Sequence, residues 1–268
     1  MYVVRGTINA ILLLAWTFVL LPIQMIAARQ AGPLSTYIPR LFHRGAALII
    51  GLRVDVIGNP LQQTPVLFVA NHASWIDIVV LGALMEAGFI AKSEVATWPG
   101  VSLLARLQGS VFVARQRQKT AVQADEITAH LQRGRRLVLF PEGTSNDGRR
   151  VLAFRSGFFS VAERWPGASP LPVQSISIAY VEHHGLPIRR ADMPTFAWYG
   201  DMELAPHLWE LLCQGGSFRA RVEFHEPVSI ESHPDRKILA AHCEGLVAAG
   251  LDRAHSGQIP QQQGLVAP

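Results

Sequence analysis

From residue 53 onward, short apolar runs alternate with longer stretches in which apolar residues recur at helical spacing. Short apolar runs bounded by turn residues predict buried strands, and the stretches between them predict helices. This alternation is typical of an α/β fold with a mainly parallel central sheet flanked by helices. The expected strands are residues 53–57, 66–70, 89–91, 111–114, 137–140, 173–180 and 218–225. The expected helices are residues 76–86, 101–107, 120–132, 157–164, 203–213 and 235–249.

The beginning of the chain has a different pattern. Residues 8–28 carry no charge and are about as long as the roughly 20 residues that a bilayer core requires. Pro22 and Gln24 interrupt the second half, so a kinked helix lying partly in the membrane is an alternative to a spanning one. A signal peptide and a buried core helix are further alternatives. The N-terminal position and the flanking Arg5 and Arg29 favour a membrane segment.

Residues 37–52 predict a second, amphipathic helix, in which Arg40 and Arg44 are interleaved with apolar residues. A helix that packs against the core of the main domain is the alternative. More arginines follow the uncharged segment than precede it, which favours the downstream side as cytoplasmic. The chain is thus divided into membrane-associated helices (1–52), an α/β domain (53–252) and a tail (253–268) whose Gln, Gly and Pro content predicts disorder.

Composition narrows the possible partners. A basic amphipathic helix suits an anionic membrane surface, so membrane lipid is an expected partner. The formal net charge is only +4 at pH 7 and there is no basic run, so nucleic acid is not expected. The two cysteines, Cys213 and Cys243, are too few for a disulfide framework. No His or Cys cluster has the spacing of metal ligands, so neither a metal nor another cofactor is expected.

A histidine and a carboxylate lie where the second expected strand gives way to a helix. His72 and Asp77 follow the apolar run at residues 66–70. A histidine can take a proton from a hydroxyl near neutral pH, and a carboxylate on its other ring nitrogen fixes the tautomer. Five residues of one helix rotate by about 140° beyond whole turns, so the two side chains cannot share a helix face. His72 is therefore expected at or before the first helical turn, with Asp77 reaching back to it; a chance pair is the alternative.

Another expected strand, at residues 137–140, ends in a comparable way. It runs into Pro141-Glu142-Gly143-Thr144, which leaves backbone amides and a hydroxyl free to meet an anion or a polar head group. An ordinary strand-ending turn is the alternative. Ligands of open α/β sheets gather at the carboxyl ends of strands, so this turn and His72 are expected to face one pocket.

Together these segments resemble the glycerolipid acyltransferase family, whose members acylate glycerol phosphate, lysophosphatidate and related lysolipids. The resemblance covers about residues 50–230 and rests on four blocks: Asn71-His72-x4-Asp77, Gly109 to Arg115, Phe140 to Thr144, and the proline-centred strand at 171–176. It implies that His72 and Asp77 are the catalytic pair. It also implies that the acceptor is bound by Asn71, Lys92, Gly109, Arg115, Glu142, Gly143, Thr144 and Arg155.

One position departs from the family pattern. Ser145 stands where the family's third block ends in arginine, so a planar fork suited to phosphate is missing there. Arg149, Arg150 or Arg155 can supply the charge from nearby, or the acceptor lacks a phosphomonoester. The main acceptor that the resemblance implies is 1-acyl-glycerol-3-phosphate, which would give phosphatidic acid. Lyso-ornithine lipid is the alternative, because residues 144–150 and 198–202 look like bacterial family members that act on it.

The function implied is membrane-bound acyl transfer at the bacterial inner membrane, with the catalytic domain in the cytoplasm. His72 would remove the proton of a lysolipid hydroxyl as its oxygen attacks the thioester of acyl-CoA or acyl carrier protein. Two other functions stay open: a membrane lipid-binding scaffold that needs no acyl donor, and a thioesterase. A hydrolase would use Ser74 as its nucleophile, but Ser74 lacks a Gly-x-Ser-x-Gly turn and is expected to be a turn residue.

Overall fold

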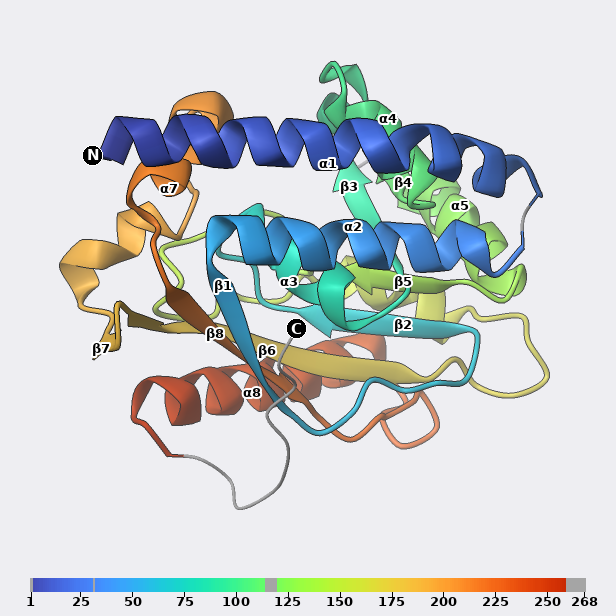
Figure 1. Cartoon of the computed structure of the whole chain (residues 1–268). Helices are drawn as coiled ribbons and strands as arrows, with labels where there is room; N and C mark the ends of the chain where they lie inside the picture. Colours follow the sequence, from blue (N-terminus) through green and yellow to red (C-terminus); the bar gives the residue numbers. More distant parts are fainter. Residues whose placement is uncertain (1, 31, 114–119, 259–268) are drawn as a thin grey trace.

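The structure is a computed structural model that describes residues 2–30, 32–113 and 120–258. Its described residues form an eight-stranded sheet in the order β1-β8-β6-β2-β5-β3-β4, with β7 paired to β6 (Figure 1). Strand β6 is antiparallel to β7 and β8, and the other neighbouring pairs are parallel. This confirms the expected α/β fold. The strands are β1 (Leu52–Ile57), β2 (Val66–Ala70), β3 (Gly88–Lys92), β4 (Val111–Val113), β5 (Arg136–Leu139), β6 (Val173–His183), β7 (Leu186–Pro187) and β8 (Phe218–Phe224).

Helices cover both faces of the sheet. Figure 1 shows α2 and α3 over one face and α8 over the other, with α1 above α2. The helices are α1 (Tyr2–Gln30), α2 (Leu34–Ile50), α3 (Ile76–Leu84), α4 (Val101–Leu107), α5 (Thr120–Gln132), α6 (Ser160–Glu163), α7 (Leu204–Gln214) and α8 (Arg236–His255). The 3-10 helices within the described residues are η1 (Ser93–Thr97), η3 (Ser156–Phe159) and η4 (Arg190–Thr195).

Strand β2 lies between two large hydrophobic clusters, one on each face of the sheet. Successive side chains of a strand point to opposite faces, so Phe68 joins the core under α2 and α3, whereas Leu67 and Val69 join the core under α8. All five residues of β2 are fully buried. A parallel strand buried on both faces needs an unbroken apolar run, which is what the sequence has at 66–70.

Most expected elements agree with the structure, and the differences have physical reasons. β2, α4 and α5 have the expected bounds. The expected helix at 157–164 is split into η3 and α6. β6 continues beyond residue 180 to His183 because its last residues pair with β8 across a bulge. α8 continues to His255, so the prediction of disorder is wrong for residues 253–255; residues 259–268 lie outside the described part of the chain.

The two N-terminal helices pack on the α/β domain. α1 is one helix that continues through Pro22, and it lies along the domain (Figure 1). Asn9 Nδ2 donates to Leu212 O at 3.1 Å near its start, and Gln24 Nε2 donates to Leu107 O at 2.7 Å near its end. α2 contributes Ala46, Ala47 and Ile50 to the main core. The predicted boundary at residue 52 therefore marks a change of secondary structure within one packed unit.

Candidate active site

His72 and Asp77 form a close pair at the carboxyl end of β2. His72 Nδ1 lies 2.9 Å from Asp77 Oδ2. His72 precedes α3 and Asp77 is in its first turn, which is the arrangement that their spacing predicts. The His72 ring stacks on Phe140, with centroids 4.1 Å apart and planes 17° from parallel. The carboxylate at Nδ1 leaves Nε2 as the ring nitrogen that can accept a proton from a substrate.

The Asp77 carboxylate is fully buried and accepts several hydrogen bonds. Oδ2 accepts the backbone N–H groups of Ala73 and Ser74, at 2.8 and 2.9 Å, as well as the His72 ring. Oδ1 accepts the hydroxyl of Tyr180 at 2.6 Å. These donors offset the cost of burying a carboxylate, and they fix the loop between β2 and α3 around it.

The Glu142 carboxylate holds the same loop from the neighbouring strand. β2 and β5 are adjacent and parallel, so the residues after their carboxyl ends lie side by side. Glu142 Oε1 accepts the backbone N–H of His72 at 3.0 Å. Oε2 accepts Asn146 Nδ2 at 2.6 Å and the backbone N–H of Leu152 at 3.2 Å. Burial raises the pKa of Glu142 to about 7, although these hydrogen bonds oppose the rise.

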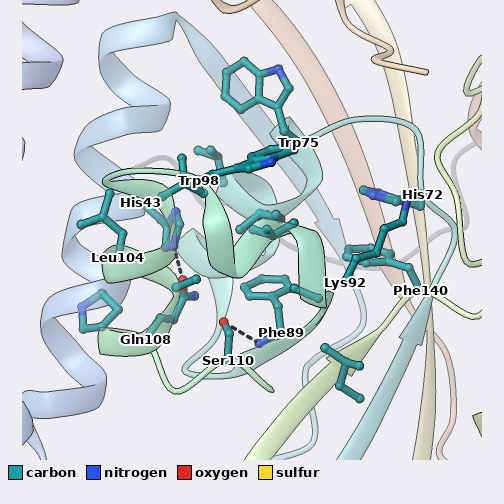
Figure 2. A pocket seen from close by; sticks show the side chains of 18 of the residues that line it. His43, His72, Trp75, Phe89, Lys92, Trp98, Leu104, Gln108, Ser110 and Phe140 are labelled. Atoms are coloured by element: carbon teal, nitrogen blue, oxygen red, sulfur yellow. Dashed lines mark hydrogen bonds between the residues drawn. The ribbon is translucent and has the colours of Figure 1, made fainter. Parts of the chain in front are cut away.

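His72 lines a large, mostly apolar cavity of about 1220 Å³. Figure 2 shows His72, Phe140 and Lys92 at one side of this cavity, and His43 and Gln108 at the other. The apolar lining comes from both N-terminal helices, from β3 and from α4; it includes Leu20, Leu21, Phe42, Ile50, Phe89, Ile90, Leu104 and Leu107. The cavity exceeds the roughly 300–1,000 Å³ of common small-molecule pockets, and its surface suits a long hydrocarbon chain.

Several predicted acceptor-binding residues lie at this cavity. Lys92 at the end of β3, Gly143 and Arg155 all line it, and Ser145 does so as well. Gly143 has φ +70°, and a Cβ placed there would lie 3.1 Å from Arg155 Cζ, so the glycine allows the guanidinium to approach the turn. Among the three arginines considered near Ser145, Arg155 lines the cavity, whereas Arg149 and Arg150 do not.

Other predicted residues have different surroundings. Asn71 is buried, and its amide exchanges two hydrogen bonds of 2.8 Å with the backbone of Ile178 on β6. The side chain of Glu142 is 2% exposed and does not line the cavity. Thr144 Oγ1 lies 3.4 Å from Ser145 O.

Gly109 and Arg115 belong to the second block of the resemblance. Gly109 precedes β4 and lies at the amino ends of the strands, opposite the carboxyl ends where His72 lies, so the structure does not bring it beside the pair. Gly109 lines a separate pocket of about 370 Å³ with Arg106, His130 and Arg135. Arg115 lies outside the described residues.

The structure also bears on two further questions from the sequence: whether Ser74 can act as a nucleophile, and whether a metal site is present. Ser74 is fully buried and does not line the cavity, so its hydroxyl is not placed to attack a substrate there. Within residues 2–30, 32–113 and 120–258, no group of three His, Cys, Asp or Glu side chains could hold a metal ion.

Sequence reasoning missed Tyr180 and Asn146 as members of this site. Asn146 lies four residues after Glu142 in a turn, where the sequence offers no periodic signal. Tyr180 lies 103 residues from Asp77 along the chain. It reaches the carboxylate because β6 pairs with β2 in parallel, and that pairing is not visible in the sequence.

Comparison with known proteins agrees with this fold and shows the family. The acyltransferase family model matches residues 53–179. A lyso-ornithine lipid O-acyltransferase of Brucella abortus is 40% identical over 265 residues, which cover 96% of this chain and 99% of that protein. The chain therefore belongs to the glycerolipid acyltransferase family and is an acyltransferase, as the four sequence blocks predict.

The names of the similar proteins specify two different acceptor lipids. A lyso-ornithine lipid O-acyltransferase of Rhizobium meliloti is 40% identical, covering 87% of this chain and 81% of its own. A 1-acyl-sn-glycerol-3-phosphate acyltransferase of Neisseria meningitidis serogroup B is 30% identical, covering 76% of each chain. The crystal structure of the 1-acyl-sn-glycerophosphate acyltransferase PlsC from Thermotoga maritima has the same fold, with a TM-score of 0.64, 20% identity, and coverage of 97% of this chain and 100% of that one.

Proposed function

We propose that this acyltransferase moves a fatty acyl group from a thioester to the free hydroxyl of a lysolipid, with His72 as the general base. The observation that carries the proposal is the His72–Asp77 pair at 2.9 Å, placed in the wall of an apolar cavity of about 1220 Å³. The pair supplies the base that a hydroxyl needs in order to attack, and the cavity supplies a place for hydrocarbon chains. This arrangement favours acyl transfer over a scaffold that has no use for a base.

Each bond change can be assigned to a group of the substrates or the protein. The hydroxyl oxygen of the acceptor attacks the thioester carbonyl carbon while its proton passes to His72 Nε2. Asp77 holds the proton on Nδ1 and stabilises the imidazolium that forms. The carbon–sulfur bond then breaks, and the leaving thiolate takes the proton from His72. No nucleophile from the protein and no cofactor takes part, and the acyl-CoA or acyl carrier protein is a co-substrate.

We propose lyso-ornithine lipid as the acceptor, with 1-acyl-glycerol-3-phosphate as the second candidate. Lyso-ornithine lipid is supported by the two relatives at 40% identity and by Ser145 at the position where the family carries a phosphate-binding arginine. The second candidate is supported by the Neisseria relative and by Arg155, whose guanidinium lies at the cavity beside Gly143. Arg155 and Lys92 would meet the carboxylate of the first head group or the phosphate of the second.

We propose that the protein works at the inner membrane with α1 immersed in the lipid and the α/β domain on the cytoplasmic side. α1 is long and apolar enough to cross a bilayer, and only 17% of its most apolar window is buried in the protein. However, it contacts the domain near both of its ends, through Asn9 and Gln24. This packing favours a helix that lies in the membrane plane and brings the cavity to the lipid.

The test is an acceptor panel with the purified full-length protein. Acyl-CoA or acyl carrier protein thioester is supplied with lyso-ornithine lipid, with lysophosphatidate or with no acceptor, and free thiol and acylated lipid are measured together. The proposal predicts both products with lyso-ornithine lipid and neither without an acceptor. Preference for lysophosphatidate would show that 1-acyl-glycerol-3-phosphate is the acceptor, and the proposed reaction would stand. Thiol release without any acceptor would indicate a thioesterase, and no release at all would indicate a scaffold.

A further inference from the structure

Tyr180 lies behind the His72–Asp77 pair, on the side away from the cavity. Its hydroxyl donates to Asp77 Oδ1 at 2.6 Å, whereas His72 binds Oδ2 of the same carboxylate at 2.9 Å. The tyrosine is 1% exposed and its ring packs against Phe196 and Phe218, with centroids 6.2 and 6.4 Å away, so it has little freedom to move. The three side chains thus form a continuous chain of hydrogen bonds from the sheet to the cavity.

We propose that Tyr180 is a positioning residue for acyl transfer, which holds Asp77 in the orientation that keeps a proton on His72 Nδ1 and leaves Nε2 free to act as the base. This role rests on the proposed function of the same site. A carboxylate has two oxygens and can rotate, and the bond to Oδ1 fixes that rotation while the backbone of residues 73 and 74 fixes Oδ2. The ring of His72 then has one orientation and one tautomer.

Tyr180 keeps its proton near neutral pH and so remains a hydrogen-bond donor to Asp77. Burial and the neighbouring carboxylate raise the pKa of Tyr180 well above its ordinary value, so the hydroxyl keeps its proton. A protonated phenol next to Oδ1 stabilises the ionised form of Asp77 and draws part of its negative charge away from His72. Removal of the phenol oxygen would leave more of that charge facing the imidazole, which would then hold a second proton more tightly.

Other titratable groups surround this chain of bonds. Glu142 accepts the backbone N–H of His72, and Lys92 and Arg155 line the cavity on the substrate side. Behind the pair, uncharged rings pack against Tyr180: Phe196, the residue after η4, and Phe218 at the start of β8. A substitution at Tyr180 leaves all of these charged groups in place, so a change in the titration of His72 between variants reports the lost hydrogen bond.

The first experiment compares Tyr180→Phe with wild type by NMR titration of the His72 imidazole, identified from the resonance lost in His72→Ala. The expected result is a rise of the titration midpoint by about half a unit to one unit, together with a roughly tenfold lower kcat and an unchanged KM. The matched control is Ser177→Ala, which removes a buried hydroxyl from the same strand; Ser177 Oγ lies 2.7 Å from His225 Nε2 and does not contact the pair. The control should leave the midpoint unmoved.

A second measurement keeps the proposal testable if Tyr180→Phe does not fold. Replacement of all four tyrosines by 3-fluorotyrosine makes the phenol a stronger donor and preserves its shape, so the midpoint should fall instead of rising. An unchanged midpoint in either sample would overturn the proposal. The titration needs no substrate, so it can be read even if the acceptor panel fails, and a failed titration leaves the assignment of acyl transfer intact.

Discussion

Glu142 Oε1 accepts the backbone N–H of His72 at 3.0 Å, and so connects the turn after β5 to the loop that carries the proposed base. The second oxygen of the same carboxylate accepts Asn146 and Leu152. The resemblance assigns Glu142 to acceptor binding, whereas these contacts lie inside the protein and the side chain does not line the cavity. The geometry favours a role in holding His72 in place.

Glu142→Gln separates these two roles. In this variant an NH2 group, which cannot accept a hydrogen bond, replaces one of the two carboxylate oxygens that accept from His72, Asn146 and Leu152. The loop that carries His72 should therefore loosen. The expected result is a fall in kcat of roughly 10- to 100-fold, with little change in the KM for the lysolipid. Steady-state kinetics at saturating thioester measure both constants. A large rise in KM with kcat preserved would instead assign Glu142 to the acceptor.

The raised pKa of Glu142 predicts how stability depends on pH. The pKa is about 7 in the folded protein and about 4.5 in the unfolded chain, so this group favours folding fully below pH 4.5 and loses that contribution as pH rises through 7. The free energy of unfolding of wild type, relative to Glu142→Gln, should therefore be roughly 2–3 kcal/mol larger at pH 5 than at pH 8. Urea denaturation of both proteins at the two pH values measures this difference; an equal gap at both would contradict it.

Gly143→Ala tests the approach of Arg155 to the turn. The substitution places a Cβ at φ +70° and 3.1 Å from the guanidinium carbon, so it should cost roughly 1–2 kcal/mol of stability and displace Arg155. Displacement of the cation should raise the KM for the lysolipid by roughly tenfold. Gly185→Ala is the matched control, because Gly185 has φ +79° and nothing within 4 Å of its added Cβ. Equal KM values in the two variants would show that Arg155 does not bind the acceptor.

Phe18→Glu tests whether α1 enters the lipid. Phe18 is 70% exposed on α1, so a glutamate there leaves the protein's packing intact but places a charge in the membrane. Binding to anionic vesicles in a sedimentation assay should weaken by at least tenfold, the loss roughly expected for one buried aromatic side chain. Ile238→Glu on α8 is the control, since Ile238 is 53% exposed on the opposite face of the sheet. Equal weakening by both substitutions would indicate non-specific repulsion.

Much of the fold follows from local patterns that the sequence contains. The apolar run at 66–70 predicts β2 because a strand buried on both faces has no polar positions. The bounds of α8 were less predictable, because helix ends depend on capping and packing that span only a few residues. The packing of α1 along the domain could not be predicted, because an apolar helix at the N-terminus has the same composition in a membrane and in a core.

One part of the site could also be predicted from local sequence, whereas another part could not. The spacing of His72 and Asp77 is enough to place the histidine before α3 and the aspartate in the first turn of α3, with its carboxylate pointing back to the histidine. The contact between Glu142 and the His72 loop depends on the adjacency of β2 and β5, and the contact of Tyr180 depends on β6 lying on the other side of β2. Strand order is set by tertiary packing, so neither contact can be deduced from local sequence.

The most direct test of the account is the rate of thiol release from an acyl thioester by wild type and by His72→Ala, each with lyso-ornithine lipid as acceptor. His72 is 19% exposed and its removal leaves the packed core untouched, so the variant should fold and bind vesicles like wild type. With His72 as the base, acylated lipid and free thiol should both fall by roughly a thousandfold in the variant. Turnover by His72→Ala at the wild-type rate would contradict the assignment of His72 as the base.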